Sequence, residues 1–110
     1  MRCNAMQCQR CCVRFTAFFL SGMCADIESI PEGEIVLLHA CAHNPTGVDP
    51  SAAQWAVLAD IFVAKKLVPL FDSAYQGYAT GDPTTDAVAI RTFAAKSSAE
   101  IPSMVFLTWA

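Results

Sequence analysis

The chain has 110 residues, of which 55% are hydrophobic and only 15% are charged, and its formal net charge is −3. This composition is too apolar for a disordered chain, lacks the basic excess of a protein that binds nucleic acid, and contains no apolar run long enough for a membrane-spanning helix. A domain of this size keeps much of its surface in water, so the apolar excess indicates part of a larger buried core.

The first segment, residues 1–21, contains three arginines and no acidic residue. This bias is typical of an organelle transit peptide, and the apolar run within the segment also resembles a short signal-peptide core. We predict that residues 1–21 form a poorly structured leader and that a domain occupies residues 22–110.

Five of the six cysteines lie in the first 24 residues. A secreted disulfide framework would distribute its cysteines through the fold that they cross-link, so this crowding does not indicate one. Cys8 and Cys11 have the spacing of half a zinc knuckle, but no second pair follows at finger distance. We therefore favour reduced thiols over a metal-binding arm.

A short helix and a buried strand come next. Residues 22–33 suit a short helix closed by a Pro/Gly turn. Residues 35–38 form a continuous apolar run with β-branched members, which is typical of a strand buried on both faces.

Three potential metal ligands follow this strand. His39, Cys41 and His43 alternate, so in an extended chain their side chains share one face. They could bind zinc, or they could pack beneath a site and tune it through hydrogen bonds. We favour packing, because no fourth ligand is evident.

A turn and a crossover helix separate this strand from the next. In the sequence Asn-Pro-Thr-Gly at 44–47, the residue before proline is kept out of helical geometry, so the strand cannot continue directly into a helix. We predict that Asp49 caps the helix, with Pro50 in its first turn. Lys65 and Lys66 suit the carboxyl end, where we expect them to be solvated. The apolar stripe of this helix comprises Trp55, Leu58, Ile61 and Phe62.

The second strand is predicted at residues 67–71, although Pro69 within it removes one ladder donor. Asp72 follows at once, and a carboxylate at the end of a buried strand is costly unless a cation or hydrogen-bond donors meet it. Tyr75 lies three residues later. Because the carboxyl ends of parallel strands share one edge of a sheet, we expect Asp72 and Asn44 to face the same site.

The remaining elements complete the pattern. A second helix is predicted at residues 86–96 and a third apolar strand at 104–107. The sequence therefore predicts an α/β fold with a partial parallel sheet of order βαβαβ. Right-handed crossovers would place both connecting helices on one face of the sheet, leaving the other face apolar and uncovered, so we expect the isolated chain to aggregate or stay partly molten.

Two strings of residues carry a resemblance to a known family. Residues 39–47 read His-Ala-Cys-Ala-His-Asn-Pro-Thr-Gly, and residues 71–77 read Phe-Asp-Ser-Ala-Tyr-Gln-Gly. Residues 22–107 resemble the aspartate aminotransferases and, more broadly, the class I aminotransferases that use pyridoxal 5′-phosphate. The resemblance implies a fragment of the large domain of a fold-type I pyridoxal-phosphate transferase, which in the family forms a homodimer.

The resemblance also implies roles for individual residues. Asn44 and Tyr75 match the residues that hydrogen-bond the phenolic oxygen of the cofactor, and Asp72 matches the aspartate that pairs with its pyridine nitrogen. A carboxylate there keeps the nitrogen protonated, and the protonated ring then accepts electrons when the substrate loses a proton. His39 and His43 match histidines that lie behind Asp72. No metal ligand is implied.

Other parts of the family's site have no match in the chain. These are the lysine that binds the cofactor covalently, the two arginines that grip the substrate, the phosphate loop and the aromatic residue stacked on the ring. We therefore expect an enzyme fragment, inactive alone, whose parent transfers an amino group between aspartate and 2-oxoglutarate in the cytoplasm or, alternatively, in mitochondria. The alternatives are a truncated, non-enzymatic paralogue with a Cys-rich arm for a metal or a partner, or a fragment of an aromatic or broad-range aminotransferase.

Overall fold

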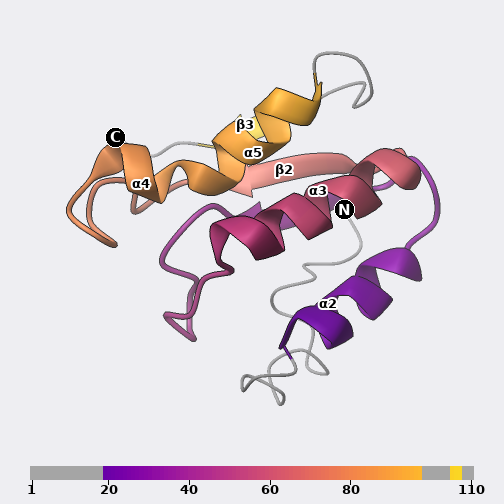
Figure 1. Cartoon of the computed structure of the whole chain (residues 1–110), viewed down its shortest axis with the longest axis horizontal. Helices are drawn as coiled ribbons and strands as arrows, with labels where there is room; N and C mark the ends of the chain where they lie inside the picture. The colour runs from indigo at the N-terminus through magenta and orange to yellow at the C-terminus, as the bar shows by residue number, and fades with distance from the viewer. Residues whose placement is uncertain (1–18, 98–104, 108–110) are drawn as a thin grey trace.

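The computed structural model describes residues 19–97 and 105–107. Three parallel strands form one sheet in the order β1-β2-β3, with a helical connection after β1 and another after β2 (Figure 1). The predicted α/β class and βαβαβ order are confirmed. The elements are α2 (Phe19–Glu28), β1 (Ile35–His39), α3 (Ala52–Ala64), β2 (Val68–Asp72), α4 (Pro83–Asp86), α5 (Val88–Ser97) and β3 (Val105–Leu107).

The register of the sheet brings the ends of the strands together. β1 and β2 are aligned without offset, so that His39 lies beside Asp72. On the other side of β2, Asp72 lies beside Leu107 of β3. The described pairing with β3 begins at Leu70, one residue beyond Pro69, so this proline has one described neighbouring strand, which suits its missing donor.

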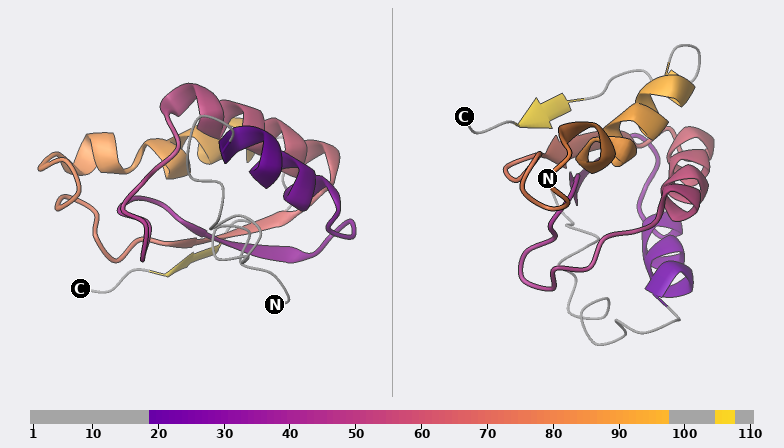
Figure 2. Two further views of the ribbon diagram at one scale, coloured as in Figure 1. Left: turned by 90° about the horizontal axis from the view of Figure 1, so that it is seen from below. Right: turned by 60° about the vertical axis from the view of Figure 1, so that its left-hand side comes forward.

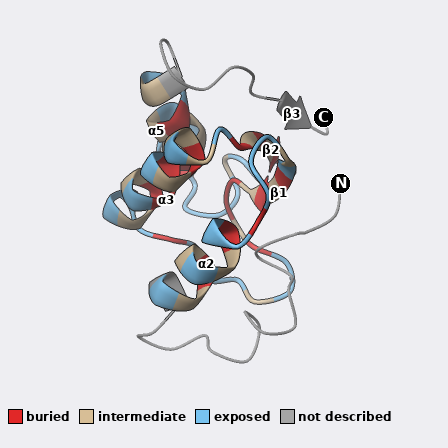
Figure 3. Ribbon diagram, turned by 90° about the vertical axis from the view of Figure 1, so that its right-hand side faces the viewer, coloured by how far each residue is buried: buried red, intermediate tan, exposed pale blue. Residues whose placement is uncertain are grey.

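The core lies between one face of the sheet and the helices (Figure 3). Alternate strand residues such as Val36, Leu38 and Phe71 point into it and are fully buried. Helix α3 packs against both α5 and α2. Four rings meet edge to face, with centroids 5.1 to 6.2 Å apart, an arrangement that aromatic pairs prefer; they are Trp55, Phe62, Phe71 and Phe93.

Several element boundaries differ from those predicted. Helix α2 begins at Phe19, within the segment 1–21 that was predicted to be a leader; residues 1–18 lie outside the described part, and the leader remains a prediction. The single helix predicted at 86–96 is two helices, because the chain breaks at Ala87.

The predicted cap of the crossover helix was wrong. Ser51, not Asp49, is the N-cap of α3: its hydroxyl accepts a hydrogen bond from the Gln54 N–H, while the Gln54 side chain accepts one from the Ser51 N–H. This reciprocal pair is a capping box. The Asp49 carboxylate is used elsewhere, because it accepts hydrogen bonds from backbone groups of the preceding loop.

The described helices all lie on one side of the sheet (Figure 2). Because side chains alternate along a strand, the other face carries Ile35 and Leu37 of β1 and Val68 and Leu70 of β2. None of these four is buried, and Ile35 is 42% exposed. In the described part of the chain, no helix covers this apolar face. No described helix is both long and apolar enough to cross a membrane.

The two faces of β1 allow a matched test. Leu38→Thr removes a fully buried apolar side chain from the core, so it should lower the free energy of unfolding by about 2–5 kcal/mol. We expect this loss to abolish the helical circular dichroism signal. Leu37→Thr, one residue away on the uncovered face, should keep that signal and lower both aggregation and the binding of a hydrophobic dye. Equal loss of structure in both variants would contradict the arrangement.

Candidate functional site

A small pocket lies at the edge of the sheet where β1 and β2 end. Its volume is about 110 Å³, and its lining comes from the two segments that follow these strands. The structure thus brings together Asn44, Asp72 and Tyr75. In the sequence, Asp72 and Tyr75 lie 28 and 31 positions after Asn44, with α3 between them. The lining residues are His39, Cys41, Asn44, Asp72, Ala74 and Tyr75.

Asp72 supplies the only carboxylate in the lining of this pocket. The residue is half-buried, and its Oδ1 atom is buried with no hydrogen-bond partner. Its main-chain oxygen accepts a hydrogen bond from the Ala40 N–H at 2.9 Å, which ties the end of β2 to the end of β1. A buried carboxylate oxygen without a donor is costly, so this atom marks a place where a donor or cation belongs.

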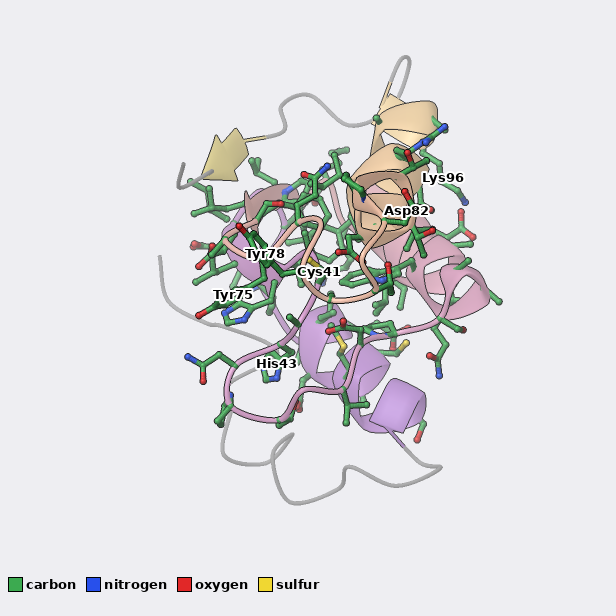
Figure 4. All side chains as sticks on the ribbon, turned by 90° about the vertical axis from the view of Figure 1, so that its left-hand side faces the viewer. Cys41, His43, Tyr75, Tyr78, Asp82 and Lys96 are labelled. Atoms are coloured by element: carbon green, nitrogen blue, oxygen red, sulfur yellow. The ribbon has the colours of Figure 1, made fainter. Side chains whose placement is uncertain are left out.

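Asn44 and Tyr75 line the pocket from the segments that follow β1 and β2. Both residues are exposed, with Tyr75 49% accessible. The backbone N–H of Asn44 donates to His39 Nδ1 at 3.2 Å. This bond makes Nδ1 an acceptor, so neutral His39 carries its proton on Nε2. Figure 4 shows Tyr75, Cys41 and His43 on the loops at this end of the molecule.

The two histidines lie together behind Asn44. Their ring centroids are 4.8 Å apart, and the rings are tilted by 47°. His43 is 99% buried, and its Nδ1 lies 2.5 Å from the Thr46 hydroxyl, while His39 lies at the pocket wall. In the described residues, no group of three His, Cys, Asp or Glu side chains is arranged to hold a metal ion.

The loop that carries Asn44 closes on Asp49. The Asp49 carboxylate accepts hydrogen bonds from the N–H of Ala42 at 2.7 Å and from the N–H of His43 at 2.9 Å. Ala42 has φ of +48°, an unfavourable conformation for a residue with a side chain. The carboxylate therefore holds the loop in a shape that the backbone alone does not favour.

The loop that carries Tyr75 closes on a second carboxylate. Asp86 is 3% exposed and accepts hydrogen bonds from the N–H of Gly77 at 2.8 Å, of Ala79 at 3.1 Å and of Thr80 at 3.1 Å, and from the Thr80 hydroxyl at 2.7 Å. Burial by itself raises the pKa of a carboxyl group, but these hydrogen bonds outweigh burial and hold the pKa of Asp86 below its ordinary value.

Cys41 separates the pocket from a larger cavity. It lines both the small pocket and a cavity of about 450 Å³, whose walls also include Asp49, Trp55, Thr80 and Asp86. Burial, with the negative charges of Asp86 and Asp49 nearby, raises the pKa of the Cys41 thiol to about 11. The thiol is therefore protonated and unreactive at neutral pH.

Sequence analysis missed the roles of Asp49 and Asp86. Both were assigned to helices, Asp49 as a cap and Asp86 as a first-turn residue, because acidic residues are common at helix starts. Each instead reaches back over six to nine residues to the loop before it. The only available signal was the position of each aspartate shortly after a turn that carries a site residue.

The described lysines lie away from the carboxyl ends of the strands: Lys65 and Lys66 follow α3, and Lys96 is in the last turn of α5. Lys66 forms an exposed ion pair with Glu32 at 2.6 Å, and Lys96 pairs with Asp60. None of the lysines lines the pocket at the ends of the strands.

Residues 3–108 match the family model described as aminotransferase class I and II. Over 73 residues the chain is 53% identical to a chloroplastic aspartate aminotransferase of Arabidopsis thaliana, and this alignment covers 66% of the chain but only 16% of the relative. Other relatives of the same name are mitochondrial or cytoplasmic. The chain spans roughly a fifth of the length of the curated relatives that it matches.

Solved structures agree with this match. An aspartate aminotransferase from Trypanosoma cruzi is 55% identical with a TM-score of 0.69, over 71% of this chain and 20% of that chain. An aromatic-amino-acid aminotransferase from Burkholderia pseudomallei, covalently bound to pyridoxal phosphate, is 46% identical with a TM-score of 0.63, over 71% of this chain and 19% of that one. The sequence identity in both alignments is high enough to indicate common family membership as well as a shared fold.

The pKa of Cys41 leads to a labelling test. Alkylation by iodoacetamide requires the thiolate, which at pH 8 is about 0.1% of a thiol with a pKa of 11, and the thiolate fraction rises about tenfold per pH unit below that value. We expect Cys41 to be labelled far more slowly in the folded chain than in urea, as measured by peptide mass spectrometry. The half-buried Cys24 is the internal comparison. Equal labelling of Cys41 at pH 8 with and without urea would contradict its burial.

Proposed function

Because the chain belongs to the class I and II aminotransferase family, we propose that it forms part of the pyridoxal phosphate site of an aspartate aminotransferase. Such an enzyme transfers an amino group between aspartate and 2-oxoglutarate. The observation that carries the proposal is the buried, unpartnered Oδ1 of Asp72, which lines a pocket that Asn44 and Tyr75 also line.

The residues of the pocket fit one side of the cofactor. A pyridinium N–H is the kind of charged donor that the Asp72 carboxylate lacks. The Asn44 amide and the Tyr75 hydroxyl can both donate to a phenolic oxygen. The pocket volume of about 110 Å³ is smaller than the roughly 300–1,000 Å³ of sites that hold a whole small molecule. The chain therefore supplies one wall of the site, in keeping with its coverage of about a fifth of its relatives.

Asp72 would act through its charge. Pyridoxal phosphate, when bound, supplies an electron-accepting ring next to the bond that is broken in the substrate. A carboxylate in contact with the ring nitrogen favours the protonated form of that nitrogen, and partial burial strengthens this attraction relative to water. Asp72 thereby holds a proton at the ring nitrogen, where it favours electron withdrawal.

Asn44 and Tyr75 would act through hydrogen bonds. Donors to the phenolic oxygen favour its ionised form and orient the ring in its plane. His39 lies beside Asp72 in the register of the strands and accepts the Asn44 N–H, so it links the two sides of the site. We propose that His39, packed against His43, holds Asn44 and Asp72 in place without contacting the cofactor.

The remaining parts of the site are proposed to lie in other segments of the complete enzyme. The sequence has three lysines, and Lys66 and Lys96 form ion pairs away from the pocket while Lys65 ends α3. None is placed to bind the cofactor covalently. We propose aspartate, glutamate and their 2-oxo acids as substrates, a homodimer as the assembly, and the cytoplasm as the compartment, with mitochondria as the alternative.

Aromatic amino acids are the second candidate substrate class. The 46% identity to an aromatic-amino-acid aminotransferase supports this class, but less strongly than the 55% identity to an aspartate aminotransferase supports the first. The pocket residues contact the cofactor in either case, so they do not choose the substrate side chain. The Cys-rich arm on which a non-enzymatic paralogue would depend lies outside the described residues, and the curated relatives described above are aspartate aminotransferases.

A ligand pair tests the role of Asp72. The probe is pyridoxine 5′-phosphate, which lacks the aldehyde and therefore cannot form adducts with lysine; its 1-deaza analogue lacks the ring nitrogen. We expect Asp72→Asn to weaken binding of pyridoxine phosphate about tenfold or more, the effect of losing one charge-assisted hydrogen bond, and to leave binding of the deaza analogue unchanged. Isothermal titration at pH 7 measures both.

A matched control is Asp60→Asn, which removes an exposed carboxylate on α3 that pairs with Lys96 and lies outside the pocket. It should bind pyridoxine phosphate like the unmodified chain. The proposed function is wrong if Asp72→Asn binds pyridoxine phosphate as tightly as the unmodified chain does, or if the unmodified chain does not bind it at all.

The chain alone should not transaminate. Because none of its lysines lies at the pocket, it has no group placed to anchor the cofactor or to carry the substrate proton. With pyridoxal phosphate, aspartate and 2-oxoglutarate, we expect no turnover above that of free cofactor, and borohydride reduction should not label one lysine selectively. Turnover above the free cofactor would contradict this assignment of roles.

A further inference from the structure

We propose that Asp49 and Asp86 are positioning residues that hold Asn44 and Tyr75 at the cofactor pocket, a role that rests on the proposed function. Neither aspartate lines the pocket itself. Each is the hydrogen-bond acceptor on which one of the two pocket loops closes.

The first loop follows β1. Asp49 binds the N–H groups of Ala42 and His43, the two residues immediately before Asn44. A further bond of 2.6 Å from the Gly47 N–H to the His43 carbonyl closes the loop on the other side of Asn44. The backbone on both sides of Asn44 is therefore held in place, although Asn44 itself is exposed. These bonds also hold Ala42 in its unfavourable backbone conformation.

The second loop follows β2. Tyr75 is exposed, and its main-chain oxygen accepts a hydrogen bond from the Tyr78 N–H at 3.0 Å. Asp86 fixes the rest of the turn by binding the N–H groups of Gly77, Ala79 and Thr80. Gly77 has φ of +91°, which glycine adopts without strain and other residues rarely adopt, so the turn is built on a glycine and closed by Asp86.

The two supports meet behind the pocket. Asp49, Asp86 and Cys41 all line the cavity of about 450 Å³, and Cys41 also lines the cofactor pocket. The two loops thus close on neighbouring acceptors that line one cavity, of which Asp86 is buried and Asp49 is exposed. A carboxylate offers two acceptor oxygens to N–H groups, whereas an amide in its place keeps one acceptor oxygen and turns a donor NH2 group towards the remaining N–H groups. Asparagine at either position should therefore open one loop and spare the other.

Ligand-free NMR tests the placement of each side chain, with every variant made in the Leu37→Thr chain, which should keep its structure and aggregate less. Asp49→Asn should shift the side-chain amide resonances of Asn44 towards random-coil values and leave the ring resonances of Tyr75 in place. Asp86→Asn should do the reverse. The matched controls are Ser51→Ala and Asp82→Ala, which remove the caps of α3 and α4 and so lower stability by about 1 kcal/mol without removing either loop acceptor. These controls should leave both sets of resonances unchanged.

Binding of pyridoxine 5′-phosphate tests whether placement matters for the ligand. We expect Asp49→Asn to weaken binding about fivefold, and Asn44→Ala to weaken it less than about twofold further in that background, because the two residues act as one unit. Asp86→Asn should couple in the same way to Tyr75→Phe. In the crossed pairs, Asp49 with Tyr75 and Asp86 with Asn44, the effects of the two substitutions on the free energy of binding should add.

The outcomes separate the two proposals. If the unmodified chain does not bind the probe, the proposed function fails while the NMR comparison still decides the placement of Asn44 and Tyr75. If the chain binds the probe but the aspartate variants shift neither side chain, or shift both just as the cap variants do, Asp49 and Asp86 serve stability alone and the inference is wrong.

Discussion

The site depends on the alignment of two parallel strands. β1 and β2 pair without offset, so both end at the same level, and His39 lies beside Asp72. The hydrogen bond from the Ala40 N–H to the Asp72 main-chain oxygen extends this pairing one residue further. Residues far apart in the sequence therefore leave the sheet side by side. A slip of one residue would turn Asp72 to the opposite face and would remove the carboxylate from the pocket.

Beyond the strands, carboxylates replace regular secondary structure as the acceptors for backbone N–H groups. A loop that leaves a sheet has N–H groups that need partners, and water satisfies them only where the loop is exposed. Asp49 takes two of these groups and Asp86 takes three. The same charges lie near Cys41 and help to raise the pKa of its thiol. The two carboxylates thus support the loops and add to the larger effect that burial has on this thiol.

The sequence predicted the elements that depend on periodic apolar patterns, namely the strands, the crossover helix and the side of the sheet on which the helices lie. It also predicted that Asn44 and Asp72 would share an edge, because that follows from parallel topology alone. It did not predict the backbone N–H groups from which Asp49 and Asp86 accept hydrogen bonds. An aspartate near a helix start has two local uses, as a cap or as an acceptor for the preceding loop, and only the three-dimensional path of the chain selects between them. The break at Ala87 was missed for a similar reason, since Asp86 is turned inward by its hydrogen bonds.

The uncovered face of the sheet affects the chemistry of the pocket. Alternation along the strands places Asp72 on the same face as Val68 and Leu70, and His39 on the same face as Leu37. Any layer that packs on these apolar side chains will also border the Asp72 carboxylate. Such a layer would displace water and lower the local dielectric constant, so the attraction between this carboxylate and a cationic ring would grow as the layer closes. The strength of cofactor binding is thereby linked to the completeness of the domain.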